Sequence, residues 1–143
     1  MKHLLVVYMM VALLFLGACG AAQTSPAPVD VVGKQVQAAG GSYTDVSVAE
    51  LQTMLANKEF TFVNVHIPFE GSIPGTDIAI PYDQIGQELD KLPDKAAKIV
   101  LYCRSGRMSA IAAKTLVILG YNNVWNLSGG MSAWEQAGLT IEQ

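Results

Sequence analysis

The sequence predicts an α/β fold, in which helices cover both faces of a sheet that contains parallel strands. Two observations support this prediction. From about residue 43 onward, strand-like and helix-like segments alternate along the chain, as they do in parallel sheets with helical crossovers. In addition, residues 98–102 read KIVLY, and such a continuous apolar run is typical of a strand buried on both faces.

The first half of this region predicts two helices. Ser47 and Glu50 form a capping-box pattern, so we expect a helix over 48–55 with one buried face. Asp83 can cap a second helix that runs to Leu92 and ends before a proline. The other expected segments are a strand over 60–65, a turn-rich stretch over 66–75 and a short extended piece over 78–80.

The second half predicts two strands, each followed by a helix. We expect strands over 98–102 and 123–127, a helix over 108–119 closed by Gly120, and a last helix over 131–137. Cys103 directly follows the first of these strands. Ligands of α/β sheets bind beyond the carboxyl ends of the strands, so Cys103 lies where a functional site is expected.

The N-terminus predicts an export signal. Lys2 precedes an apolar run, 4–16, which is shorter than the roughly 20 residues that span a bilayer but suits a signal peptide. Leu16-Gly17-Ala18-Cys19 resembles a bacterial lipobox. We therefore expect a lipoprotein signal peptide over 1–18, a lipidated Cys19 with a flexible linker over 19–42, and a domain over 43–143. The expected location is extracytoplasmic, on a bacterial membrane; an uncleaved anchor or an ordinary secretory signal are the alternatives.

Composition excludes some classes of function. The 143 residues contain nine Lys and Arg and carry a net charge of -3, which does not suggest a nucleic-acid-binding protein. No phosphate-binding GxxxxGK[ST] motif is present. Once the signal peptide is removed, His66 and Cys103 are too few ligands for zinc. A lipidated Cys19 cannot pair with Cys103, which leaves one free thiol.

Cys103 opens the loop CRSGRMS, and this setting suggests a reactive thiol. The thiolate is the nucleophilic form, and the expected helix N-terminus, Arg104 and Arg107 would all stabilise negative charge on sulfur. Gly106 allows backbone N–H groups to curl around one anion. The alternative is an inert buried cysteine. A cysteine-based phosphatase would need arginine six positions after the cysteine, where this chain has Ser109.

The loop Cys103–Ser109 closely resembles the active-site loop of rhodanese-like sulfurtransferases. Ser47–Leu55, Phe62–Pro68 and Ile73–Thr76 are similar to further segments of that family, and Asn126–Trp134 matches its C-terminal GG-x-x-x-W signature. The resemblance covers the chain from about Tyr43 to the end. It implies a three-layer α/β domain around a mostly parallel sheet of about five strands.

The resemblance also implies a reaction. Cys103 would take a sulfane sulfur from a small anionic donor such as thiosulfate and hold it as a persulfide. A nucleophilic acceptor, cyanide or a thiol, would then remove it, with a protein as a further possible acceptor. No metal or organic cofactor is implied. The implied substrate-binding residues are those of the loop: Arg104, Ser105, Gly106, Arg107, Met108 and Ser109.

Three positions depart from the family pattern. Where the family has Asp-x-Arg after its second strand, this chain has Asn64 and His66, and Ser72 replaces a common histidine. These changes alter the charge at that edge and leave the cysteine loop intact. Two alternatives to the enzyme therefore stay open. One is a non-enzymatic module that carries a persulfide or binds a partner, and the other is an extracytoplasmic thiol redox sensor.

Overall fold

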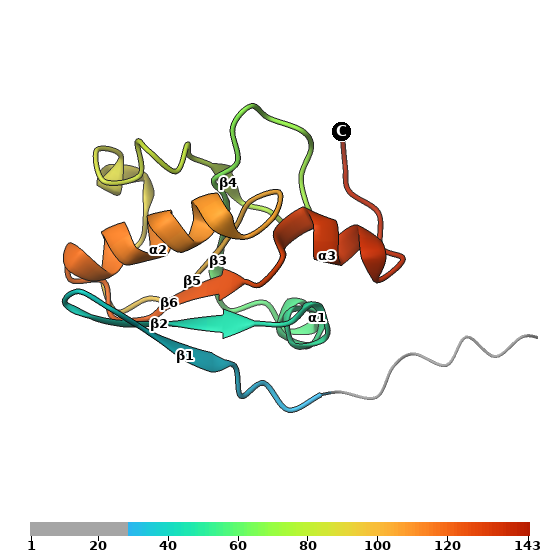
Figure 1. Cartoon of the computed structure of the whole chain (residues 1–143), viewed down its shortest axis with the longest axis horizontal. Coiled ribbons are helices and arrows are strands. Elements are labelled where there is room, and N and C mark those ends of the chain that lie inside the picture. Colours follow the sequence, from blue (N-terminus) through green and yellow to red (C-terminus); the bar gives the residue numbers. More distant parts are fainter. Residues whose placement is uncertain (1–28) are drawn as a thin grey trace, which may run out of the picture.

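The computed structural model describes residues 29–143. The expected signal peptide and Cys19 lie outside the described residues. A six-stranded sheet forms the centre, in the order β1-β2-β6-β5-β3-β4 (Figure 1). The strands are β1 Lys34–Ala38, β2 Gly41–Val46, β3 Thr61–Asn64, β4 Ile78–Ala79, β5 Ile99–Tyr102 and β6 Val124–Leu127. The helices are α1 Val48–Ala56, α2 Arg107–Ile118 and α3 Gly130–Gln136, with a 3-10 turn at Leu89–Lys91.

The sheet confirms the predicted fold class. Every pairing is parallel except that of β1 with β2, which is antiparallel. The expectation of about five strands was close, and the sixth strand is the N-terminal edge strand β1. Five carboxyl strand ends therefore share one edge of the sheet, where Cys103 follows β5.

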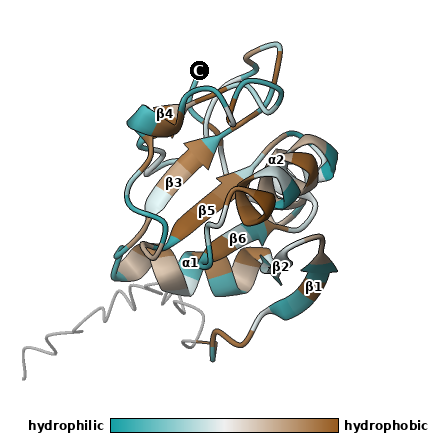
Figure 2. Cartoon of the chain, turned by 90° about the vertical axis from the view of Figure 1, so that its left-hand side faces the viewer, coloured by the Kyte–Doolittle hydropathy of each residue, from teal (hydrophilic) through white to brown (hydrophobic). Residues whose placement is uncertain are grey.

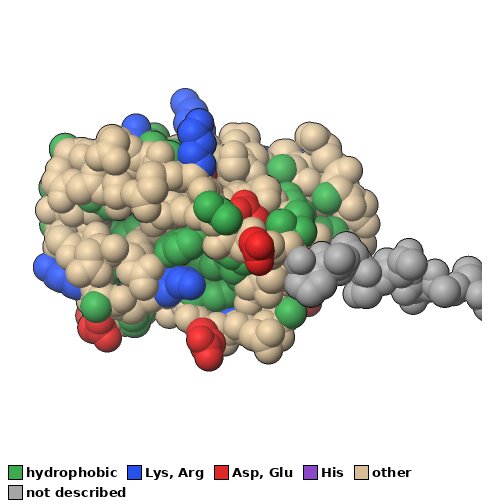
Figure 3. Space-filling model, turned by 90° about the horizontal axis from the view of Figure 1, so that it is seen from below, with side chains coloured by type: hydrophobic (Ala, Val, Ile, Leu, Met, Phe, Trp, Pro, Cys, Tyr) green, Lys and Arg blue, Asp and Glu red, His purple; other side chains and the backbone are tan. Residues whose placement is uncertain are grey.

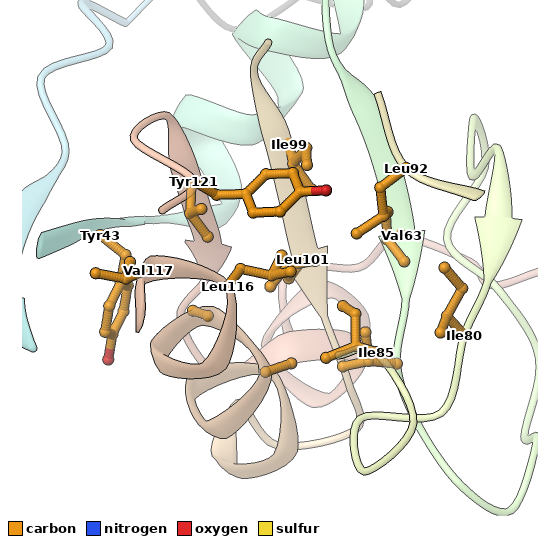
Figure 4. Close-up of a cluster of buried hydrophobic side chains, with 14 of the residues drawn as sticks. Tyr43, Val63, Ile80, Ile85, Leu92, Ile99, Leu101, Leu116, Val117 and Tyr121 are labelled. Carbon is orange, nitrogen blue, oxygen red and sulfur yellow. The ribbon is translucent and has the colours of Figure 1, made fainter. Parts of the chain in front are cut away.

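Successive side chains of a strand point to opposite faces of the sheet, so the core forms two apolar clusters, one on each face. Ile99 and Leu101 of β5 pack on the α2 side, where Figure 4 shows Leu101 close to Leu116. Val100 and Tyr102 pack on the opposite side, in the cluster that includes residues of α1 and α3. All four residues of β5 are fully buried, as the apolar run predicted. Figure 2 shows this contrast between the hydrophobic β5 and the hydrophilic edge strand β1.

The helix expected over 83–92 does not form. Instead, turn bonds run from Gln84 N to Pro81 O and from Gln87 N to Gln84 O, and only Leu89–Lys91 adopts a 3-10 turn. Gly86 disfavours a continuous helix, because glycine loses the most backbone freedom on ordering. Ile85 and Leu92 are nevertheless buried and Leu89 packs partly against the core, so the apolar pattern of this stretch reflects burial and not helical periodicity.

The prediction of a flexible linker over 19–42 is wrong for residues 34–42, which belong to β1, the turn after it and the start of β2. Residues 34–38 form β1, and a turn at Ala39–Gly40 leads directly into β2. Val36 and Ala38 pack against the core while Gln35 and Gln37 face solvent, which is the alternation of an edge strand. The folded domain therefore begins before residue 43.

The capping box predicted for α1 is present, and it also fixes the chain before β1. One oxygen of Glu50 accepts the Ser47 backbone N–H at 2.8 Å, and the other accepts the Gly33 N–H at 2.8 Å and the Val32 N–H at 3.2 Å. These backbone hydrogen bonds, first from Ser47 and then from Gly33, lower the pKa of Glu50 to about 2. Glu50 thus joins the N-terminal segment to the start of α1.

Charge is spread thinly over the surface in view in Figure 3, where green apolar areas lie between separate basic and acidic side chains. No helix within residues 29–143 combines the length and the apolar character that a membrane crossing requires.

Candidate active site

Cys103 lies at the carboxyl edge of the sheet, between the end of β5 and the start of α2. Its exposed fraction is 1%, and two hydrogen-bond donors approach its sulfur. The Gly106 N–H donates to Sγ at 3.1 Å, and the Ser109 hydroxyl approaches Sγ at 3.5 Å. Both donors would stabilise negative charge on the sulfur, so the local geometry suits a thiolate or a persulfide.

Gly106 gives the loop its curvature. It is the N-cap of α2 and adopts φ +92°, a left-handed conformation that glycine adopts without strain. A Cβ at this position would lie 3.1 Å from the Gly129 amide nitrogen, so the loop and the segment before α3 are in close contact. This turn aims the Gly106 N–H at Cys103.

The double glycine of the C-terminal signature, Gly129-Gly130, packs against the same loop. Gly130 has φ +55°, and a Cβ there would lie only 2.1 Å from the carbonyl oxygen of Cys103. The next two amides, of Met131 and Ser132, donate to the carbonyl oxygens of Cys103 and Arg104, each at 2.9 Å. The loop carbonyls are thus held by α3, which orients the peptide units around the thiol.

Ser109 stands where a cysteine phosphatase would need arginine. It is completely buried, and its hydroxyl lies 3.2 Å from the Gly106 carbonyl oxygen and 3.5 Å from Sγ, so its single hydrogen can donate to one of these acceptors at a time. A serine here can orient the loop but cannot grip phosphate with a guanidinium. The geometry therefore agrees with sulfur chemistry better than with phosphate hydrolysis.

The two arginines of the loop differ in their surroundings. Arg104 Nη1 lies 2.9 Å from Glu135 of α3, and its Nε lies 3.8 Å from Glu70. Arg107 is exposed at the start of α2 and forms no ion pair with any residue from 29 to 143. Of the remaining predicted site residues, Ser105 is exposed and Met108 packs partly against the core.

The positions that depart from the family pattern meet beside this loop. Asn64 is buried; its amide donates to the Gly71 carbonyl at 2.9 Å, and its oxygen accepts the His66 N–H at 3.0 Å. An aspartate could not donate the first of these bonds, so asparagine suits this turn. The Ser72 backbone instead pairs with Glu142 near the C-terminus, through bonds of 2.8 and 2.7 Å.

The His66 side chain is 9% exposed, and neither ring nitrogen has a hydrogen-bond partner within the described part of the chain. Its Nε2 lies 3.2 Å from Glu70, close enough for an ion pair when the imidazole is protonated. The His66 ring is thus largely buried at the edge of the site, with Nε2 beside the Glu70 carboxylate.

Sequence reasoning missed the acidic partners of the site. Glu70 and Glu135 come from a turn and from the last helix, and no motif marks either residue. It also missed the Tyr102 hydroxyl, which accepts the Ile73 N–H at 3.0 Å and lies 2.7 Å from the Thr76 hydroxyl. Within residues 29–143, no three His, Cys, Asp or Glu side chains gather as a metal site would require.

The fold and the site together define an α/β domain with a single cysteine cradled between a strand and a helix N-terminus. Comparison with known proteins agrees, since the family model of the rhodanese-like domain matches residues 47–137. The chain therefore belongs to the rhodanese-like domain family.

Similar proteins that are named as sulfurtransferases support sulfur transfer as the general class of reaction. A sulfurtransferase of Allochromatium vinosum is 34% identical over 93 residues, which cover 63% of this chain and 85% of the relative. The thiosulfate sulfurtransferase GlpE of Actinobacillus pleuropneumoniae is 25% identical over 71% of this chain and 94% of its own length.

Solved structures agree with the fold. A rhodanese-related protein from Thermoplasma volcanium is 30% identical with a TM-score of 0.57, covering 68% of this chain and 95% of its own. A rhodanese-like domain protein from Staphylococcus aureus is also 30% identical, with a TM-score of 0.58 and coverages of 69% and 98%. A Rhodopseudomonas palustris protein described as a possible tyrosine phosphatase is 27% identical, with a TM-score of 0.58 and coverages of 68% and 83%.

Proposed function

We propose that this protein is a sulfurtransferase that carries a sulfane sulfur on Cys103. The observation that carries the proposal is the position of the thiol. It is buried at the carboxyl end of β5, with the Gly106 N–H at 3.1 Å and the first turn of α2 directed at it. A helix N-terminus and an aimed amide favour an anion on this sulfur.

In the first half-reaction, the Cys103 thiolate attacks the outer sulfur of the donor. With thiosulfate, the donor S–S bond breaks, a new Cys103 S–S bond forms, and sulfite leaves with the bonding electron pair. The product is a Cys103 persulfide anion. The Gly106 amide and the neighbouring loop amides stabilise charge that moves onto the terminal sulfur, as an oxyanion hole does for oxygen.

In the second half-reaction, a nucleophile removes the terminal sulfur. Cyanide attacks that sulfur, the Cys103 S–S bond breaks, thiocyanate is released and the thiolate is restored. A thiol acceptor gives a new persulfide by the same step, and a protein thiol is a further candidate acceptor. The two half-reactions share one covalent intermediate, so ping-pong kinetics are expected.

Thiocyanate production tests this function. Purified protein incubated with thiosulfate and cyanide should form thiocyanate, while a Cys103→Ala variant of equal stability should not. The matched control is Cys19→Ala, which removes the other cysteine of the chain. Activity that persists without Cys103 would refute the proposal.

The N-terminal sequence supports the further proposal that the enzyme is an extracytoplasmic lipoprotein anchored through Cys19. At least two acyl chains on one residue give stable membrane attachment. In a bacterial host, a labelled fatty acid should enter the wild-type protein but not Cys19→Ala, which should leave the membrane fraction. Equal labelling of both proteins would contradict the anchor and leave the sulfurtransferase proposal untouched.

A persulfide-carrying module is the second candidate function. The paired Arg104 favours it, because a cation neutralised by carboxylates attracts a free anionic donor less strongly. This candidate predicts that the Cys103 persulfide forms and persists, with turnover only when a partner protein is added.

A further inference from the structure

The charge around the candidate site differs from what the loop sequence alone indicates. The loop contains two arginines and no acidic residue. Folding brings two carboxylates to Arg104, Glu135 at 2.9 Å from α3 and Glu70 at 3.8 Å from the turn after β3. We call Glu70, Arg104, Arg107 and Glu135 the charged rim.

The charged rim has no net charge. Its two arginines and two carboxylates cancel, and the buried His66 beside Glu70 adds a positive charge only when it is protonated. The side chains of Glu70, Arg104 and Glu135 are 48%, 41% and 40% exposed, so a small ion that approaches the loop meets all three charges in solvent. The rim therefore offers a dianion little of the attraction that two unpaired arginines would provide.

We propose that Glu70 and Glu135 are specificity-determining residues that weaken the preference of the site for the dianion thiosulfate relative to sulfur donors with one negative charge. This proposal rests on the sulfurtransferase function proposed above. The carboxylates act on the approach and loading of the donor and take no part in bond making.

Two donors that differ in charge but react by the same chemistry separate the effect of donor charge from effects on the sulfur-transfer step. Thiosulfate carries two negative charges, and methanethiosulfonate carries one, because a methyl group replaces one oxygen. In both, the Cys103 thiolate attacks the terminal sulfur and the S–S bond breaks. Methanethiosulfonate releases methanesulfinate where thiosulfate releases sulfite, and the same Cys103 persulfide remains.

The size of the effect follows from Coulomb's law. A carboxylate about 6 Å from the donor in a water-like dielectric changes the binding of each donor charge by roughly threefold. Replacing one carboxylate with its amide keeps the shape and removes the charge. The ratio of thiosulfate to methanethiosulfonate reactivity should therefore rise about threefold per carboxylate, or about tenfold for both, and the gain should shrink at high salt.

The experiment measures kcat/KM for both donors, with cyanide as acceptor, in the full-length wild type, Glu135→Gln, Glu70→Gln and the double variant. Glu59→Gln is the matched control, because this exposed carboxylate precedes β3 at the opposite edge of the sheet. We expect the donor ratio to rise in the three rim variants and to stay constant in Glu59→Gln.

The outcomes of this experiment test the donor specificity and the sulfurtransferase function separately. If both donors react in the wild type but the ratio is the same in every rim variant, the specificity proposal is wrong and the sulfurtransferase function stands. A rise in the ratio for Glu59→Gln equal to that for Glu135→Gln would also overturn it, because the effect would then reflect overall charge. If neither donor loads Cys103 in the wild type, the proposed function itself fails.

Discussion

At the scale of single residues, the site depends on contacts that leave no room for a side chain. Gly130 is the clearest case, because its missing Cβ would lie 2.1 Å from the Cys103 carbonyl oxygen. That contact lets the Met131 and Ser132 amides reach the loop. The geometry of the thiol therefore depends on a glycine 27 residues further along the chain.

Gly130→Ala should displace the Cys103 loop. The clash of the new Cβ with the Cys103 carbonyl adds to the strain of an alanine at φ +55°. We therefore expect the free energy of unfolding to fall by about 1–3 kcal/mol and thiocyanate production to fall strongly. Denaturant unfolding and the activity assay measure the two effects. Gly138→Ala is the control, since Gly138 has φ +80° but no atom near the position of its Cβ. Equal losses in both variants would show that backbone strain alone is responsible.

Ser109→Ala should weaken the site without dismantling it. The variant removes a hydroxyl 3.5 Å from Sγ and keeps the buried volume nearly unchanged. Because the Gly106 amide remains, we expect loading of Cys103 to slow by about tenfold, the worth of one hydrogen bond of roughly 1.4 kcal/mol. Mixing the protein with donor, quenching the reaction at successive times and measuring the fraction of persulfide by mass spectrometry gives this rate. A loading rate equal to that of wild type would mean that Ser109 only supports the loop.

At the scale of elements, Glu50 couples α1 to the chain that precedes β1. Its lowered pKa, about 2 against an ordinary 4.5, means that folding favours the carboxylate. The stabilisation is fully present above about pH 4.5 and is lost as the pH falls toward 2. Since Glu50 accepts bonds from Ser47 and Gly33, acid should loosen both segments together.

Glu50→Gln should therefore lower stability by about 1 kcal/mol at neutral pH and by progressively less below pH 4.5. Unfolding free energies of the variant and the wild type, measured between pH 7 and about pH 3, test this. Glu59→Gln serves as the control for a change in net charge. A difference between variant and wild type that does not depend on pH would contradict the role assigned to the carboxylate.

The strand β1 also matters to stability, although its sequence suggested a linker. A fragment that begins at residue 43 loses β1 and the first two residues of β2, which exposes the edge of the rest of β2 and uncovers Tyr43, a buried residue of the core. We expect the fragment 43–143 to unfold at lower denaturant concentration than the fragment 29–143. Equal midpoints would show that β1 adds nothing to the domain.

At the scale of the whole molecule, local signals predicted most of the fold. The apolar run of β5, the capping box of α1 and the cysteine loop were all legible because neighbouring residues define them. Three features were not. Gly86 and short turns replaced an expected helix, the polar side chains of β1 resembled a linker, and Glu135 reached Arg104 only through the packing of α3. Contacts between distant segments leave no local pattern in the sequence.

Intact mass spectrometry can establish whether Cys103 carries a sulfur atom that cyanide removes. The protein is incubated with methanethiosulfonate, desalted, weighed, treated with cyanide and weighed again, beside Cys103→Ala. The wild type should gain the mass of one sulfur atom at Cys103 and lose it to cyanide, while Cys103→Ala should not change in mass. A wild-type mass that stays constant, or an equal gain in Cys103→Ala, would contradict it.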